Sequence, residues 1–328
     1  MLYPAVVNAG WLAPLVAFFI CGLSLLVLMQ RANRLPMDHP NARSLHATPT
    51  PRIGGIGVVV AIFISFVLIQ SHVLLPFILG VSVLAAISLL DDYKNLPALW
   101  RLLAHVLVAV VYVLSFSGLQ GSGLLVAILA IVWMTNLYNF MDGADGLAGG
   151  MAVIGFGALA IAAWGAGDQE VAIFCAAIAS AALAFLFFNF PPAKIFMGDT
   201  GSIPLGFLAA SIGVYGTSQN YWPALFPLMI FSPFILDASV TLVKRALRSE
   251  KIWRAHREHY YQRLVRMGWS HRKMTLASYA LMLLCAVLGL TYLQQPESAT
   301  LLIALWLSCF VGIFIAVDRR WARLKNDL

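Results

Sequence analysis

Charged residues are scarce in this chain, and their scarcity excludes an ordinary water-soluble domain. Only 11% of the 328 residues are Asp, Glu, Lys or Arg, whereas 61% are hydrophobic, and the mean hydropathy is +0.86. Soluble domains carry about 25% charged and roughly 45–50% apolar residues. A soluble protein of this composition would expose large apolar patches. The sequence therefore predicts a polytopic membrane protein.

Cysteine is also rare, and the few cysteines present do not resemble a metal site. All of them fall in apolar segments, without the short spacing typical of metal ligands: Cys21, Cys175, Cys285 and Cys309. We expect them to be small residues of the packed interior. The first apolar segment has no basic region before it, so we do not expect a cleaved signal peptide.

Long apolar segments make up most of the chain. A helix needs about 17–25 apolar residues to cross a bilayer. We expect spans at residues 11–30, 53–70, 73–90, 102–119, 122–140, 147–165, 169–190, 202–218, 222–242, 274–293 and 299–317. The sequence thus predicts an all-α polytopic membrane protein with about 11 transmembrane helices, built as a single domain over residues 1–328.

Lysine and arginine gather on one side of this arrangement. All 21 of them fall in alternate connections or in the C-terminal tail, with ten between residues 244 and 273. Positive charge marks the cytoplasmic side of a membrane protein. We therefore expect a periplasmic N-terminus and a cytoplasmic C-terminus. The net charge of +7 then reflects topology and attraction to membrane lipid, and we expect no nucleic-acid partner.

The stretch TNLYNFMDGADGLAGG, residues 135–150, concentrates polar groups at the mouth of an apolar segment. It contains Asn136, Asn139, Asp142 and Asp145. Such groups are costly at a membrane boundary unless something compensates them. Mg²⁺ is a natural candidate, because it prefers oxygen ligands and bridges carboxylates to phosphates. A simple Gly-Asp turn would explain one Asp-Gly pair, but not two pairs and two asparagines.

Two more acidic sites lie on the predicted cytoplasmic side. Adjacent Asp91 and Asp92 end one span, with Lys94 one helical turn after Asp91. They could supply a general base or a metal ligand, or they could form a solvated helix end. Asp199 lies between Gly198 and Gly201 in a turn just before the next span. Three acidic sites would thus converge on one face of the membrane.

Two basic loops accompany these acids. The loop RANRLPMDHPNARSLHATPTPRIGGIG, which includes Arg43, suits either a phosphorylated ligand or an ordinary juxtamembrane role. The loop KRALRSEKIWRAHREHYYQRLVRMGWSHRKM places His256 and His259 on one helical face. Arginines at positions 254, 257 and 263 favour phosphate contact there, although a plain amphipathic helix is the alternative. Asp237 is either paired with a basic neighbour or functional.

The motifs DHPNARSLHATPTPRIGG, LLDDYKN, NLYNFMDGADGLA, IFMGDTGS and HREHYYQRL occur in this order. Together they resemble the polyprenyl-phosphate N-acetylhexosamine-1-phosphate transferase family over residues 38–264. The resemblance implies a multi-pass enzyme of the bacterial inner membrane. It would join a phospho-sugar from UDP-N-acetylhexosamine to undecaprenyl phosphate and release UMP. The implied cofactor is Mg²⁺, with Mn²⁺ as the alternative ion, and a homodimer is compatible with this reading.

The resemblance also implies roles for individual residues. Asp199 and Asn139 match metal-ligand positions. The implied catalytic residues are Asp91, Asp92, Lys94 and Asp142, among which base, lipid-phosphate and metal-associated roles stay open. The implied substrate-binding residues are Gly143, Asp145 and Phe196 around the uracil, and Arg43, His256, Arg257 and His259 near the phosphates and sugar.

One departure from the family pattern bears on the substrate. The translocase that loads the peptidoglycan precursor has a run of consecutive histidines where this chain has His-Arg-Glu-His. The pattern therefore favours the branch that initiates O-antigen, and hence lipopolysaccharide, on a simple N-acetylhexosamine. Phospho-N-acetylmuramoyl-pentapeptide transfer is the alternative within the family. From another class, an ion-coupled secondary transporter would place its acids near the bilayer midplane and commonly show inverted repeats.

Overall fold

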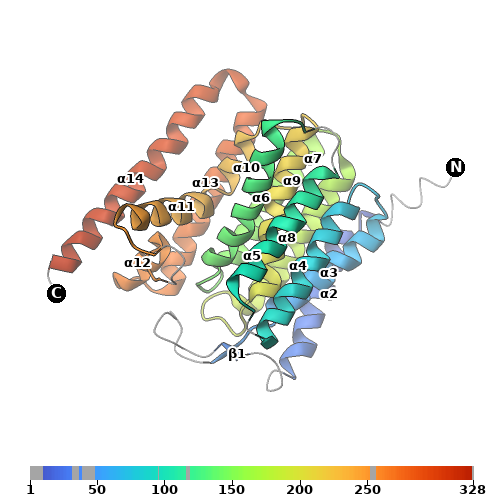
Figure 1. The fold of residues 1–328 in the computed structure, drawn as a ribbon, viewed down its shortest axis with the longest axis horizontal. Coiled ribbons are helices and arrows are strands. Elements are labelled where there is room, and N and C mark those ends of the chain that lie inside the picture. The colour runs from blue at the N-terminus through green and yellow to red at the C-terminus, as the bar shows by residue number, and fades with distance from the viewer. Residues whose placement is uncertain are drawn as a thin grey trace.

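A computed structural model describes residues 10–31, 37–38, 49–94, 96–115, 119–251 and 256–326. The chain forms a bundle of helices (Figure 1). The helices are α2 (Ala13–Met29), α3 (Gly54–Ile69), α4 (Leu75–Lys94), α5 (Ala98–Leu114), α6 (Ser122–Met141), α7 (Leu147–Gly165), α8 (Gln169–Asn189), α9 (Asp199–Ser218), α10 (Leu225–Ile230), α11 (Ser232–Leu247), α12 (Tyr260–Arg266), α13 (His271–Gln294) and α14 (Ala299–Asn326). A short antiparallel pair joins β1 (Met37–Asp38) and β2 (Thr50–Pro51).

The helices confirm the all-α, polytopic membrane character. In the described part of the chain, six helices are long and apolar enough to cross a membrane, namely α4, α6, α7, α8, α13 and α14. α2, α3 and α5 are apolar but shorter. The expected number of eleven spans and the expected orientation of the termini remain predictions.

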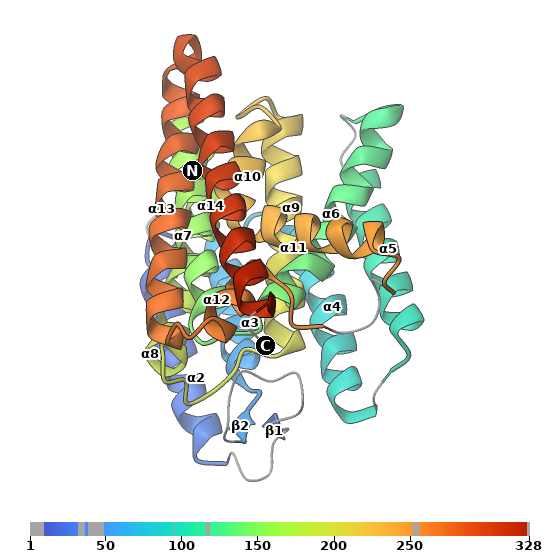
Figure 2. The same ribbon diagram turned by 90° about the vertical axis from the view of Figure 1, so that its left-hand side faces the viewer.

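The expectation of one continuous span over residues 222–242 is wrong. α10 ends at Ile230 and α11 begins at Ser232, and both views show α11 lying across the bundle (Figures 1 and 2). Pro233 causes the break, because it has no N–H for the carbonyl of Met229 four residues earlier. The Ser232 hydroxyl donates to that carbonyl instead, at 2.6 Å, and accepts from the Trp306 indole at 2.9 Å.

Close backbone contact joins the start of α3 to the turn before α9. The Gly55 amide donates to the Met197 carbonyl at 2.8 Å, and the Phe196 amide donates to the Pro51 carbonyl at the same distance. A Cβ added at Gly55 would lie 2.6 Å from the Gly201 Cα, so no larger residue fits there. This contact brings the first polar loop against the Asp199 turn.

Candidate active site

Asp199 lies at the meeting point of three helices. It opens α9 after Gly198, whose φ of +71° favours glycine. The Asn139 amide on α6 donates to one carboxylate oxygen at 2.8 Å. The Arg101 guanidinium on α5 lies 3.3 Å from the other oxygen. The structure therefore brings the two predicted metal-binding residues into direct contact.

Arg101 is a site residue that sequence reasoning missed, because it counted only as a charge for topology. Its guanidinium also lies 2.8 Å from Asp91, so it bridges two acidic motifs. α4 ends at Lys94 and α5 begins at Ala98, and this reversal places Arg101 against Asp91. Lys94 is exposed and has no ion pair within the described part of the chain. The sequence does offer one signal for a role of Arg101 in the site, namely its position one turn into the helix that follows the Asp pair.

The two adjacent aspartates have different surroundings. Asp91 accepts hydrogen bonds from the Leu96 amide at 2.6 Å and from Arg101 at 2.8 Å. Asp92 is half-buried and accepts a long bond of 3.5 Å from the Thr200 hydroxyl, next to Asp199. Asp92 is thus the less engaged of the two carboxylates and the one that faces the start of α9.

Asp142 follows directly at the end of α6. Burial, reinforced by the charge of Asp199, raises the pKa of the Asp142 carboxyl well above its ordinary value. Arg52 acts in the opposite direction and is itself paired with Asp38 at 2.8 Å. The described part of the first polar loop therefore contributes a cation to the acidic cluster. Arg43 lies outside the described residues.

The loop after α6 is held from two sides. The Asp145 carboxylate accepts from the Ala193 amide at 3.0 Å and lies 3.9 Å from the His271 ring. The Gly146 amide donates to Asn189 at 2.8 Å. Gly143 lies against the Tyr261 hydroxyl, where any side chain would collide. Two of the residues expected around the uracil, Gly143 and Asp145, thus sit on a fixed loop.

Phe196, the third residue expected around the uracil, lies on a different segment. Its backbone bridges to Arg52, directly before the Asp199 turn. The Phe196 carbonyl accepts from the Gly54 amide at 2.9 Å. Phe196 is therefore anchored to the same backbone contact that positions Asp199.

Residues 256–259, which we call the histidine loop, lead into α12. His259 caps this helix in a reciprocal arrangement with Gln262, and the rings of His256 and His259 lie 4.8 Å apart. Burial, with smaller effects from His259 and Arg245, lowers the pKa of His256 to about 4. His256 is therefore neutral at pH 7, whereas Arg257 beside it carries a permanent positive charge.

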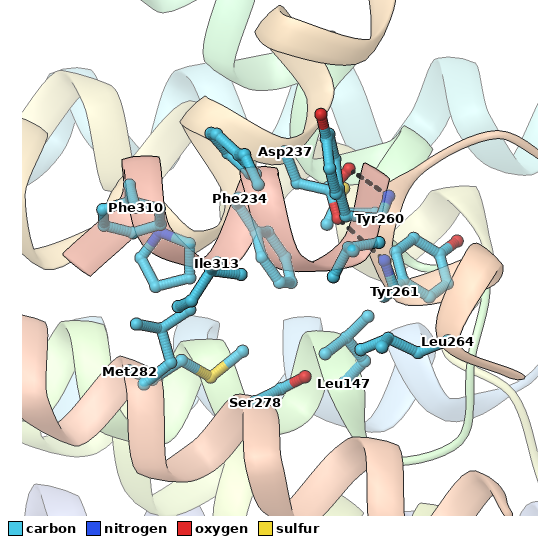
Figure 3. A pocket seen from close by; sticks show the side chains of 15 residues that line it. Leu147, Phe234, Asp237, Tyr260, Tyr261, Leu264, Ser278, Met282, Phe310 and Ile313 are labelled. Carbon is cyan, nitrogen blue, oxygen red and sulfur yellow. Dashed lines mark hydrogen bonds between the residues drawn. The ribbon is translucent and has the colours of Figure 1, made fainter. Parts of the chain in front are cut away.

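Asp237 supports the histidine loop. Its contacts favour the paired state over a functional role, the two alternatives that the sequence left open. Its carboxylate accepts from the backbone amides of Tyr260 at 2.8 Å and Tyr261 at 3.0 Å (Figure 3). It also lies 3.4 Å from the His259 ring. A cavity of about 70 Å³ with mostly apolar walls lies between these residues and α13 and α14. Asp237 is thus paired and structural.

Arg263 does not match the expectation of a phosphate contact. Its side chain is only 4% exposed and is bound to Asp318 at 2.8 Å. It also donates to the Glu258 carbonyl at 2.8 Å. Arg257 is half-buried, and its side chain forms no ion pair among the residues that the structure describes. Of these two arginines, Arg257 is the one left to bind an anion, while Arg254 lies outside the described residues.

The oxygen groups around Asp199 fit Mg²⁺. This ion commonly takes only one or two protein carboxylates and completes its coordination with phosphate oxygens and water. Asp199 supplies a carboxylate, and Asn139 supplies an amide that presents its oxygen after a simple flip. In the described ranges, no three His, Cys, Asp or Glu side chains form a ready-made metal cage. The site therefore suits a metal that arrives with a phosphorylated substrate.

Comparison with known proteins identifies the family. The model for "Glycosyl transferase family 4" matches residues 74–217, which include the acidic sites from Asp91 to Asp199. A probable undecaprenyl-phosphate N-acetylglucosaminyl 1-phosphate transferase of Bacillus subtilis is 30% identical, over 95% of this chain and 93% of the relative.

Two further relatives have different substrates in their names. A decaprenyl-phosphate N-acetylglucosaminephosphotransferase of Mycobacterium leprae is 30% identical, over 82% of this chain and 79% of its own length. A phospho-N-acetylmuramoyl-pentapeptide-transferase of Geobacillus is 29% identical, over 74% of this chain and 83% of the relative. The chain belongs to glycosyl transferase family 4, as a member of the polyprenyl-phosphate N-acetylhexosamine-1-phosphate transferases.

Proposed function

We propose that this enzyme transfers an N-acetylhexosamine-1-phosphate from a UDP-sugar to undecaprenyl phosphate and releases UMP. An oxygen of the lipid phosphate attacks the phosphorus atom that carries the sugar. The bond from this phosphorus to the bridging oxygen breaks, and UMP leaves with the electron pair. The observation that carries the proposal is the contact of Asp199 with both Asn139 and Arg101, at 2.8 and 3.3 Å.

Asp199 and Asn139 would hold Mg²⁺ in this proposal. The ion would neutralise charge on the diphosphate, which is the main requirement of phosphoryl transfer. Asp92 suits the role of base toward the lipid phosphate better than Asp91, because Asp91 is already bound to Arg101 and to the Leu96 amide. Asp142 would face the same phosphate.

Basic side chains at the edge of the site would bind the diphosphate. Lys94 is exposed and, within the described ranges, pairs with no acid. Arg257 likewise forms no ion pair in those ranges. Planar arginine donors match phosphate oxygens, and a fixed cation stabilises the charge that develops on the leaving UMP. Lys94 at the end of α4 and Arg257 in the histidine loop would therefore act on the same group.

The acceptor's polyprenyl chain would lie in an apolar groove between α6, α9 and α10. This groove has a volume of about 410 Å³ and includes Trp133, Met134, Gly213 and Phe231 in its walls. Met134 is five residues before Asn139, which corresponds to roughly 8 Å along a helix. A chain seated here would bring its phosphate toward Asn139, and the apolar walls suit a hydrocarbon.

The histidine loop favours a small donor sugar. Glu258 in this loop is bound to Arg248 at 2.5 Å and lies 3.4 Å from Arg245, so the loop folds back on α11. The bulky rings of Tyr260 and Tyr261 follow at once. We infer a compact pocket for one N-acetylhexosamine, in the branch that initiates O-antigen synthesis. Relatives that act on the muramoyl pentapeptide make that donor the second candidate.

Purified enzyme, undecaprenyl phosphate and Mg²⁺ with a panel of UDP-sugars test the proposal through UMP release. We expect release with UDP-N-acetylhexosamines and little release with the UDP-muramyl pentapeptide. Release only with the pentapeptide would leave the reaction type standing and overturn the branch. A secondary transporter would release no UMP with any donor, and the gathering of Asp91, Asp142 and Asp199 at one end of the bundle disfavours that class.

A further inference from the structure

α12, the helix that follows the histidine loop, is too short to be stable alone. It has seven residues, Tyr260–Arg266, whereas isolated helices below about 12 residues are marginal in water. Tertiary contacts must therefore hold it in place. Asp237 on α11 binds the backbone amides at its start (Figure 3). Further contacts come from α13 and α14, nearer the end of the chain.

Arg263 is the central side chain of α12. It is only 4% exposed, and a buried charge without a partner is strongly destabilising. Its guanidinium lies 4.9 Å from the Tyr260 ring and 5.8 Å from the Trp321 ring. Asp318 provides the near counter-ion at 2.8 Å, whereas Glu258 lies 3.9 Å away. The orientation of Arg263, and with it α12, depends on Asp318.

Asp318 belongs to the part of α14 that extends past the apolar segment. α14 has 28 residues, which corresponds to about 42 Å, more than the roughly 30 Å of a bilayer core. Its carboxyl-terminal half lies beside α12 in both views (Figures 1 and 2). Asp318 also binds the Lys244 ammonium on α11 and accepts from the Tyr260 hydroxyl at 3.2 Å. It therefore ties α11, α12 and α14 together.

We propose that Asp318 is a positioning residue for donor binding, which holds the histidine loop through Arg263 and Tyr260. This inference rests on the proposed function, in which His256, Arg257 and His259 contact the donor. Asp318 itself contacts Arg263, Lys244 and Tyr260, and among the described residues it makes no contact with Asp91, Asp92 or Asp199. Its loss should weaken donor binding, while the groove between α6, α9 and α10 keeps its affinity for the lipid.

Steady-state kinetics of three variants test this role. Asp318→Asn removes the charge at constant size, and Asp318→Glu keeps it. Glu297→Gln removes a carboxylate charge at an exposed residue just before α14 begins. We expect Asp318→Asn to raise KM for the UDP-sugar about tenfold, which corresponds to about 1.4 kcal/mol. KM for undecaprenyl phosphate should change less than twofold. Asp318→Glu should restore most donor affinity, and Glu297→Gln should behave as wild type.

Hydrogen exchange provides a readout that does not depend on turnover. Amides of residues 256–266 should exchange faster in Asp318→Asn than in wild type, while those of residues 143–150 should not. If wild type released no UMP, the proposed function would fall, and this exchange pattern would still decide the positioning role. Should Asp318→Asn fail to fold, Arg263→Lys is the second variant, with the same selective rise in donor KM expected. Equal changes in both KM values, or unchanged kinetics and exchange, would overturn the proposal.

Discussion

Asn139 donates a 2.8 Å hydrogen bond to Asp199, although 60 positions separate the two residues in the chain. The contact joins the end of α6 to the start of α9 and places an amide beside the most central carboxylate of the site. Ser202 accepts from the same Asn139 amide at 3.0 Å, so Asn139 is fixed from two directions. This pair is the proposed Mg²⁺ site.

Asp199→Asn should lower turnover at least about 100-fold, as expected when a group that holds transition-state charge is removed. The dependence of the remaining activity on Mg²⁺ concentration should weaken, while the protein keeps its thermal unfolding temperature in detergent. Asp168→Asn is a matched control, because Asp168 caps α8 at the other end of the bundle and asparagine caps equally well. A folded Asp199→Asn enzyme with near-normal turnover would rule out the metal assignment.

Arg101→Gln should reduce kcat about tenfold or more, because the charges of Asp91 and Asp199 lose the guanidinium that bridges them. Arg101→Lys should recover only part of the activity, since one ammonium cannot reproduce the planar fork. Arg272→Gln removes an exposed arginine on α13 and should leave kcat unchanged. Equal activity of Arg101→Gln and Arg272→Gln would show that the bridge has no role in catalysis.

His256 gives a pH prediction with a defined sign. Its pKa is lowered from 6.5 to about 4 in the folded chain, chiefly by burial, so between these values only the unfolded chain binds the proton. The contribution of His256 to stability is therefore present above pH 6.5 and is lost as pH falls toward 4. The unfolding temperature of His256→Gln should drop less than that of wild type over this range. Parallel curves would contradict the buried, neutral state of His256.

The expected topology can be tested by labelling. Ser122→Cys and Ser249→Cys place thiols at two exposed positions that the charge pattern assigns to opposite sides. In a background without the native cysteines, an impermeant reagent added to intact cells should label position 122, and position 249 should react only after lysis. Labelling of both positions from outside would overturn the orientation of the acidic sites.

Much of the fold could be predicted from the sequence, because a membrane helix is marked by a long apolar run that can be recognised without knowledge of tertiary contacts. The break at Phe231 was missed, because Pro233 lies inside an apolar run and proline is tolerated in membrane helices. The structure assigns the freed carbonyl of Met229 to the Ser232 hydroxyl, and this local exchange could not be read from hydropathy.

The candidate site could be predicted only in part, for a similar reason. Asp91 and Asp199 stood out as acids at a membrane boundary, where charge is costly. Arg101 was counted only toward topology, although it lies one turn into the helix that follows the Asp pair. Arg263 lies in a loop rich in arginine and lysine, where the sequence does not distinguish it from its basic neighbours. Their roles depend on which acid lies opposite, Asp199 for the first and Asp318 for the second, and only the packing of distant helices determines that.

The choice of donor is the decisive test of the proposed phospho-sugar transfer. Apolar contacts alone discriminate related sugars by roughly 10–200-fold, so we expect some activity with several UDP-N-acetylhexosamines, including 6-deoxy forms. The measurement is UMP release, with transfer of labelled sugar phosphate to undecaprenyl phosphate, by purified enzyme and Mg²⁺ for each donor in turn. We expect lipid-linked product with simple N-acetylhexosamines and little with the muramyl pentapeptide. Absence of both UMP and labelled lipid for every donor, in an enzyme that remains folded, would contradict it.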